Sequence, residues 1–166
     1  MRLELFCNED EFEEWLRIAN YSNYADGEDE ENIKIREDFR QEMKICLENT
    51  KKLQKDFKIS FGLPILLVFR EKRSIIGTGS LRRDEHQVSA CQVNTIAIAK
   101  DKRRQGLGKK LMDEIAKLVR KHSDFKYLTL TTSSSQGFYQ KIGMRLCGVL
   151  DFGKSKRYFF ARQLRR

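Results

Sequence analysis

The sequence is poor in the residues that build metal centres and disulfide frameworks. It has two histidines, His86 and His122, and four cysteines that lie far apart without a C-x-x-C spacing. Neither histidine is near a pair of cysteines, so we expect no metal site. Cysteines separated in this way predict a reduced protein in which most of these side chains are buried.

Long apolar runs and targeting segments are also missing. The longest apolar run, residues 65–69, has the length of a strand and cannot cross a bilayer. The N-terminus lacks the apolar core of a signal peptide. We therefore expect a cytoplasmic protein, or a nuclear one in a eukaryote, that makes no membrane contact. No repeat or linker interrupts the 166 residues, so residues 1–166 are most simply one domain.

Positive charge is abundant. The sequence has 33 lysines and arginines against 24 acidic residues, a formal net charge of +9. This charge is spread over residues 103–110, 117–126 and 154–166, and it forms neither one long basic helix nor a basic strand with interleaved aromatics. The pattern does not favour nucleic acid as a partner. A basic surface of which one part holds a polyphosphate ligand explains the charge as well.

Apolar periodicity and turn residues predict the element order β-α-α-β-β-β-α-β-α-β-β. The predicted strands cover residues 3–6, 65–70, 75–81, 88–98, 127–131, 145–152 and 157–164. The first predicted helix begins near residue 10, and the other three cover residues 31–56, 105–122 and 136–142. Short turns make the strands between residues 65 and 98 antiparallel. Residues 88–131 form a strand, a crossover helix and a strand, which predicts one parallel pair.

Three details of this pattern predict packing. Gly77 and Gly79 inside a strand indicate a bulge or a close backbone neighbour. Residues 93–98 alternate little, as expected for a strand covered on both faces. In the long helix one apolar stripe is expected to pack in the core; it comprises Ile35, Phe39, Met43, Cys46, Thr50 and Leu53.

The most informative stretch runs from Arg103 to Lys109, between a predicted strand and an amphipathic helix. Glycines at such a turn let the backbone approach a ligand, and the helix start directs unpaired N–H groups and the positive end of its dipole at one point. That geometry binds phosphate. The spacing fits neither G-x-G-x-x-G nor G-x-x-x-x-G-K-[ST], which argues against a dinucleotide fingerprint and a P-loop.

Arg103-x-x-Gly106-x-Gly108 resembles the acyl-CoA loop of the GNAT superfamily of N-acetyltransferases. Phe138-Tyr139-x-x-x-Gly143-Met144 is similar to the Phe-Tyr-x-x-x-Gly-Phe segment of that family, with methionine in place of the last aromatic residue. The predicted element order is also that of the family. The resemblance implies an α/β (α+β) fold with a mixed, mostly antiparallel sheet of about seven strands, one splayed parallel pair and flanking helices.

The resemblance also implies a reaction and a cofactor site. Acetyl-CoA would donate its acetyl group to a primary amine of a protein, peptide or small molecule by direct attack in a ternary complex, without a metal. Loop N–H groups would hold the pyrophosphate, the pantetheine arm would pair with the strand end, and an N–H near Ile98 would stabilise the oxyanion. The implied cofactor-binding residues are Ile96, Ala97, Ile98, Arg103, Arg104, Gln105, Gly106, Leu107, Gly108, Lys109, Thr132 and Ser134.

Proton transfer needs an acid and a base. The resemblance makes Tyr139 the general acid for the leaving thiolate, and a tyrosine merely packed on the cofactor is the alternative. An ammonium, whose pKa is about 10, must also lose a proton, directly or through water, to a group such as a carboxylate. We take Glu85 as the candidate base, with other turn residues as alternatives; these are Glu71, Asp84 and His86. Most turn carboxylates are merely solvated, and this is the alternative explanation for each candidate.

The acceptor is the least determined part. Gln92 and Asn94 are polar in an otherwise apolar strand, and one of them is expected to face the acceptor. The acidic residues 26–31 either begin a helix or form a rim that attracts a cationic amine. Because no base stands out, a non-catalytic acyl-CoA-binding module that engages a protein partner is the alternative function.

Overall fold

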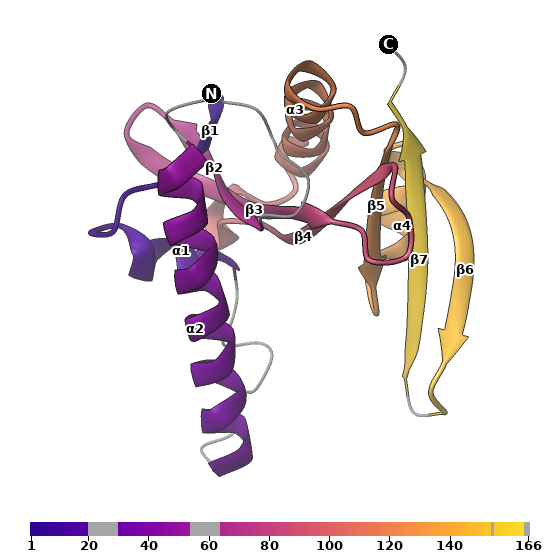
Figure 1. Ribbon diagram of the computed structural model, residues 1–166, viewed down its shortest axis with the longest axis horizontal. Coiled ribbons are helices and arrows are strands. Elements are labelled where there is room, and N and C mark those ends of the chain that lie inside the picture. The colour runs from indigo at the N-terminus through magenta and orange to yellow at the C-terminus, as the bar shows by residue number, and fades with distance from the viewer. Residues whose placement is uncertain (20–29, 54–63, 154, 165–166) are drawn as a thin grey trace.

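The computed structural model describes residues 1–19, 30–53, 64–153 and 155–164 (Figure 1). Within these ranges seven strands form one sheet in the order β1-β2-β3-β4-β5-β7-β6. All neighbouring strands are antiparallel except the parallel pair β4–β5, which confirms the predicted fold class. The strands are β1 (Arg2–Leu5), β2 (Ile65–Glu71), β3 (Ser74–Arg83), β4 (Ala90–Ile98), β5 (Tyr127–Thr132), β6 (Arg145–Asp151) and β7 (Lys156–Gln163).

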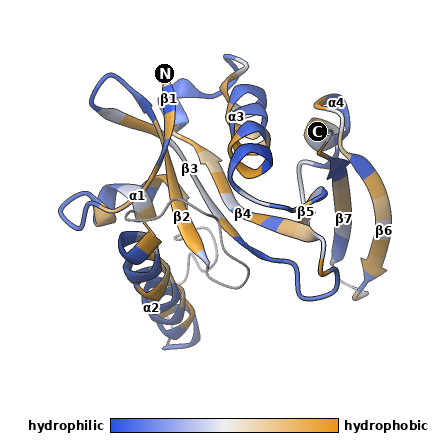
Figure 2. Ribbon diagram, turned by 45° about the horizontal axis from the view of Figure 1, so that its top comes forward, coloured by the Kyte–Doolittle hydropathy of each residue, from blue (hydrophilic) through white to orange (hydrophobic). Residues whose placement is uncertain are grey.

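Helices cover both faces of the sheet; they are α1 (Phe12–Ala19), α2 (Glu30–Leu53), α3 (Leu107–His122) and α4 (Gln136–Lys141). Leu111 and Ile115 of α3 are buried in one apolar cluster with side chains of β2 to β5 and β7. Side chains of α1 and α2, including Trp15 and Met43, form a second cluster with β2. Figures 1 and 2 show α1 and α2 beside the β1–β3 half of the sheet, with β5, β7 and β6 on the other side. No helix of the described ranges is long and apolar enough to span a membrane.

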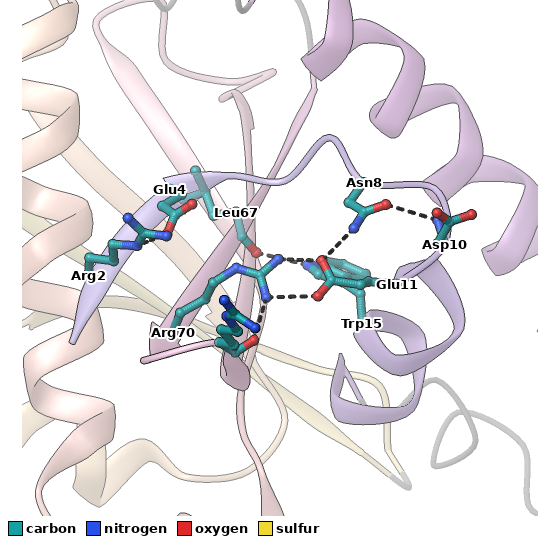
Figure 3. Close-up of polar contacts among 9 residues, drawn as sticks. Arg2, Glu4, Asn8, Asp10, Glu11, Trp15, Leu67 and Arg70 are labelled. Atoms are coloured by element: carbon teal, nitrogen blue, oxygen red, sulfur yellow. Dashed lines mark hydrogen bonds and ion pairs between the residues drawn. The ribbon is translucent and has the colours of Figure 1, made fainter.

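Polar contacts fix α1 to β2 (Figure 3). The Trp15 side chain is fully buried, and its Nε1–H donates to the carbonyl oxygen of Leu67 at 2.8 Å. Arg70 forms an ion pair with Glu11 and donates from Nη1 to Oε1 at 3.0 Å. The hydrogen bond from Arg70 lowers the pKa of the Glu11 carboxyl, and this effect outweighs the opposing effect of burial.

Helix α2 differs in part from the predicted stripe. Met43, Cys46 and Thr50 are buried as expected, but Ile35 is 39% exposed, because the buried side chains of α2 all lie in its second half. The Thr50 hydroxyl joins this half to the sheet, since it accepts from the Leu66 N–H at 2.8 Å and donates to the Cys46 carbonyl at 2.7 Å. The predicted acidic segment at 26–29, the helix end at 54–56 and the connection at 55–63 lie outside the described residues.

The Glu11–Arg70 pair predicts a pH-dependent contribution to stability. Because the folded-state pKa of Glu11 is lowered, the carboxylate stabilises the fold above its unfolded pKa of about 4.3, and this stability is lost as the pH falls through the folded value. We expect Glu11→Gln to lower the free energy of unfolding by about 1–2 kcal/mol at pH 7. The difference from wild type should shrink toward zero in acid.

Urea unfolding curves, recorded by circular dichroism at about six pH values between pH 2 and 7, measure this difference in the free energy of unfolding. Glu85→Gln is the matched control, because Glu85 is exposed in a turn. A deficit for Glu11→Gln that stayed constant over the whole pH range would contradict the assignment.

Candidate functional site

Strands β4 and β5 pair over only a short length. The register joins Ala90 to Tyr127, Cys91 to Leu128 and Gln92 to Thr129. Beyond this point β4 stays paired with β3, and β5 stays paired with β7. The two parallel strands therefore separate toward their carboxyl ends, and we refer to their unpaired parts, residues 93–98 and 130–132, as the splay. Neighbouring strands that part at their carboxyl ends form the usual ligand site of α/β sheets.

A bulge distorts β4 inside the splay. The register between β3 and β4 shifts between Thr78 and Ser80, and Thr95 has a φ of 51°. A β-branched residue rarely adopts this left-handed conformation. Two hydroxyl contacts hold it there: the Thr95 and Ser80 hydroxyls are 2.9 Å apart, and the Thr78 hydroxyl donates to the Thr95 carbonyl at 3.2 Å. The predicted bulge thus exists, and its extra residue is on β4.

The two glycines of β3 provide the close approach that the sequence also predicted. A Cβ at Gly77 would lie 2.9 Å from Cδ1 of Ile98, and one at Gly79 would lie 3.1 Å from Cδ1 of Ile96. After the bulge, Ile96 and Ile98 pack toward the α3 cluster, whereas Ala97 packs toward the α1–α2 cluster. This end of β4 is therefore packed on both faces of the sheet, as expected, although these three residues are only half-buried.

The loop between β4 and α3 presents a row of backbone N–H groups. Arg104 and Gly106 both have positive φ values, 63° and 75°, and α3 begins at Leu107. The N–H groups of residues 104–109 have no hydrogen-bond acceptor in the described parts of the chain, and the first helical bond runs from the Lys110 N–H to the Gly106 carbonyl at 3.2 Å. Successive N–H groups in alternating backbone conformations form an anion-binding concavity at the positive end of the helix dipole.

Two of the basic side chains expected at this loop also bind protein groups. Arg103 donates from Nε to the Ile98 carbonyl at 2.9 Å, which fixes the loop on the end of β4. Lys109 pairs with Asp113 at 2.9 Å, and Arg162 pairs with the same carboxylate at 2.8 Å. Burial raises the pKa of Asp113, but the hydrogen bonds from Arg162 and Lys109 lower it overall. Arg103 therefore positions the loop, a role that the sequence did not reveal.

Helix α4 lies against the loop through one ring. A Cβ at Gly108 would be 3.0 Å from Cζ of Phe138, so the glycine makes room for that phenylalanine. The ring of Tyr139 is half-buried between Phe138, at 5.1 Å between centroids, and Phe160 of β7, at 5.7 Å. The two motifs of the sequence are thus in contact, and Tyr139 lies on the helix that packs against the loop.

The other predicted residues are less closely tied to the loop. Thr132 and Ser134 form the turn between β5 and α4, where the Thr132 hydroxyl donates to the Ser134 carbonyl and accepts from its N–H at 3.2 Å. Glu85 is exposed in the turn before β4, at the end where β4 and β5 are paired. The nine residues of β4, about 26 Å of strand, separate that turn from the loop. The structure does not bring Glu85 to the loop.

A family model described as an acetyltransferase (GNAT) domain matches residues 64–144. The chain carries a GNAT acetyltransferase domain. The matched range includes the splay, the loop and Tyr139, and acetyltransferases of this family are enzymes. Comparison with curated proteins gives no match.

Solved structures share the fold of this GNAT domain over nearly the whole chain. A protein described as a GNAT-family acetyltransferase from Desulfovibrio desulfuricans has a TM-score of 0.70 at 14% identity, with 99% of each chain covered. The PaiA N-acetyltransferase of Thermoplasma acidophilum, solved in complex with coenzyme A, has a TM-score of 0.67 at 18% identity, covering 98% of this chain and 99% of that one. Ribosomal-protein-alanine N-acetyltransferase from Brucella melitensis has a TM-score of 0.65 at 16% identity, covering 99% and 100%.

The contact between Gly108 and Phe138 predicts the effect of a methyl group. Gly108→Ala would push the Phe138 ring, whereas a Cβ at Gly137 of α4 meets nothing within 4 Å. Both changes replace a helical glycine, so their difference isolates the steric cost. We expect Gly108→Ala to be less stable than Gly137→Ala by about 1 kcal/mol or more. Thermal unfolding of the two variants measures this difference, and equal stabilities would contradict the packing.

Proposed function

We propose that this protein transfers the acetyl group of acetyl-CoA to a primary amine. The observation that carries the proposal is the splay, which ends beside a loop of unsatisfied N–H groups at the start of α3. One end of this arrangement suits a pyrophosphate, and the other offers unpaired strand backbone to an extended chain. Coenzyme A has both parts, and related structures have been solved with it bound.

Each element of the site has a role in this proposal. The N–H groups of residues 104–109 bind the pyrophosphate, with positive charge from Arg104 and Lys110 around it. The backbone of residues 96–98 pairs with the pantetheine arm, and an N–H near Ile98 stabilises the oxyanion that forms when the amine attacks the thioester. Arg103 and Phe138 position these groups, since one fixes the loop on β4 and the other packs α4 against α3.

Tyr139 is the proton donor to the leaving thiolate in this proposal. A phenol with a pKa near 10 holds its proton at neutral pH and can give it to a thiolate as the C–S bond breaks. The placement of the tyrosine supports the role, because its helix packs against the loop through Phe138. The ring contacts with Phe138 and Phe160 restrict its orientation.

The amine must be deprotonated before it attacks. Glu85 is the candidate base from the sequence. Because it lies in the turn before the paired end of β4, away from the loop, its role is the first to test by substitution. Residues 26–29 of the acidic segment lie outside the described ranges, and residues 30 and 31 begin α2. An acidic rim at that segment would favour acceptors whose amine is a cation.

Calorimetric titration with acetyl-CoA, and thiol release from acetyl-CoA in the presence of a panel of amines, test the proposal. We expect binding, and thiol release that depends on the amine. Tyr139→Phe should lower kcat about 100-fold while the affinity for acetyl-CoA stays within about twofold. Binding without any amine-dependent thiol release would favour the acyl-CoA-binding module, and no binding at millimolar acetyl-CoA would reject both functions.

Glu85→Gln is the comparison variant for this experiment. Because Glu85 is exposed and far along β4 from the loop, we expect its substitution to leave kcat unchanged. A fall in kcat that matched the fall for Tyr139→Phe, together with the loss of an acidic limb in the pH profile, would instead make Glu85 the base.

A further inference from the structure

The sheet face opposite α3 is polar where β4 and β5 begin to part. In β5, Leu128 and Leu130 face the α3 cluster, so Thr129 between them faces the other way. In β4, Cys91 and Val93 likewise face the α3 cluster, so Gln92 between them faces the opposite side of the sheet. The strands thus show apolar side chains toward α3 and half-buried polar side chains toward the opposite face; the latter include Arg82, Gln92, Asn94, Thr129 and Thr131.

The apolar cluster under α1 and α2 does not extend to this polar area. From β3 this cluster contains Ile75, and from β4 Ala97 packs against it. Both residues lie at the end of these strands that is away from Arg82 and Gln92. No residue of β5 belongs to this cluster in the described chain. A sheet face that only had to pack under helices would be apolar. The polar area at the start of the splay is therefore suited to contact a polar ligand.

Arg82 places a positive charge in this area. Arg82 is half-buried and donates from Nε to Oε1 of Gln92 at 2.7 Å, a neutral partner. Asp84, two residues after Arg82 in the sequence, accepts from the Thr129 hydroxyl and from the N–H groups of residues 86 and 87 at 2.9 and 3.1 Å. Asp84 therefore closes its own turn and braces β5.

Other partly buried arginines show what Arg82 lacks. Arg70 pairs with Glu11, and Arg162 pairs with Asp113. Arg82 has no carboxylate partner among the described residues. The pKa of the Cys46 thiol on α2 is raised, first by burial and then by Glu42, whereas the charge of Arg82 lowers it. The guanidinium of Arg82 therefore lies on the α2 side of the sheet. A guanidinium whose terminal nitrogens have no partner in the described ranges is a ready bidentate site for an oxyanion.

We propose that Arg82, held by Gln92 at the start of the splay, binds an anionic group of the acceptor, so that the preferred substrates are amines that also carry a carboxylate or phosphate. This inference rests on the proposed acetyl transfer and names its substrate class. Gln92 is a positioning residue, because it holds Nε and leaves the fork of the guanidinium directed away from it.

The geometry also sets a separation between the two ends of the acceptor. On β3 the partners of Gln92 and Ile98 are Arg82 and Gly77, which are five residues apart, so about 17 Å of strand separates Arg82 from the proposed oxyanion site near Ile98. The arginine side chain covers part of that distance, and the acceptor must cover the rest. Acceptors with several bonds between amine and anion should therefore react better than glycine. An acidic rim elsewhere would be compatible, since it would attract the ammonium end of the same molecule.

Matched pairs of acceptors test the inference by thiol release from acetyl-CoA. One pair is 6-aminohexanoate and 6-aminohexanamide, a second is glycine and glycinamide, and a third is O-phosphoethanolamine and ethanolamine. We expect kcat/KM to be at least tenfold higher for the anionic member of the best pair. The 6-aminohexanoate and glycine pairs compare a long with a short acceptor, and the glycine and O-phosphoethanolamine pairs, both short, compare a carboxylate with a phosphate.

Variants then assign the preference to one side chain. Arg82→Gln should abolish the preference by raising KM for the anionic acceptor, with kcat and the KM for acetyl-CoA unchanged. Arg82→Lys should restore only part of it, because an ammonium cannot form the bidentate pair. Arg83→Gln is the matched control: it removes the same charge one residue later on β3, at an exposed position. Equal kcat/KM within each pair for wild type, or an equal loss in Arg83→Gln, would overturn the inference.

A binding measurement keeps the inference testable without turnover. The side-chain Nε–H resonance of Arg82, assigned by its absence in Arg82→Gln, should move when 6-aminohexanoate is added to protein saturated with coenzyme A, and should not move with the amide. A resonance that stays in place overturns the inference even if neutral amines are acetylated. Failure of acetyl-CoA to bind would instead reject the proposed function.

Discussion

The structure depends on one constraint: β4 and β5 are hydrogen-bonded over three residues and then part. Because the strands are parallel, both carboxyl ends lie at the same edge, and each continues into a functional segment there. β4 leads to the N–H-rich loop and α3, and β5 leads to α4 with Tyr139. Full pairing of the two strands would remove the free backbone edge of residues 93–98 on which the proposed acyl-CoA site depends.

Polar contacts at both ends keep the splay in shape. At the closed end Asp84 joins the turn before β4 to Thr129 of β5. At the open end Arg103 ties the loop to Ile98, and the Phe138 ring fills the space left at Gly108. Apolar packing supplies most of the stability, and these directional contacts hold the two ends of the splay. In our proposal the site has two halves, one for the acyl donor and one, around Arg82, for the acceptor.

Much of this could be predicted from the sequence, for physical reasons that differ between elements. The order of strands and helices follows from apolar periodicity, and the loop at Gly106 and Gly108 follows from backbone chemistry that tolerates few other residues. The role of Arg103 and the strain at Thr95 could not be predicted, because both depend on partners brought close only by the folded sheet. The predicted core position of Ile35 is wrong because periodicity cannot show where a long helix leaves the sheet.

Amide hydrogen exchange with and without coenzyme A tests the central claim most directly, because it reports on the backbone groups themselves. The account predicts slower exchange on addition of coenzyme A at the N–H groups of residues 104–109 and along residues 96–98, with no change in β1 at the far edge of the sheet. Protection confined to any other surface, with exchange in the loop and in β4 unchanged, would contradict it.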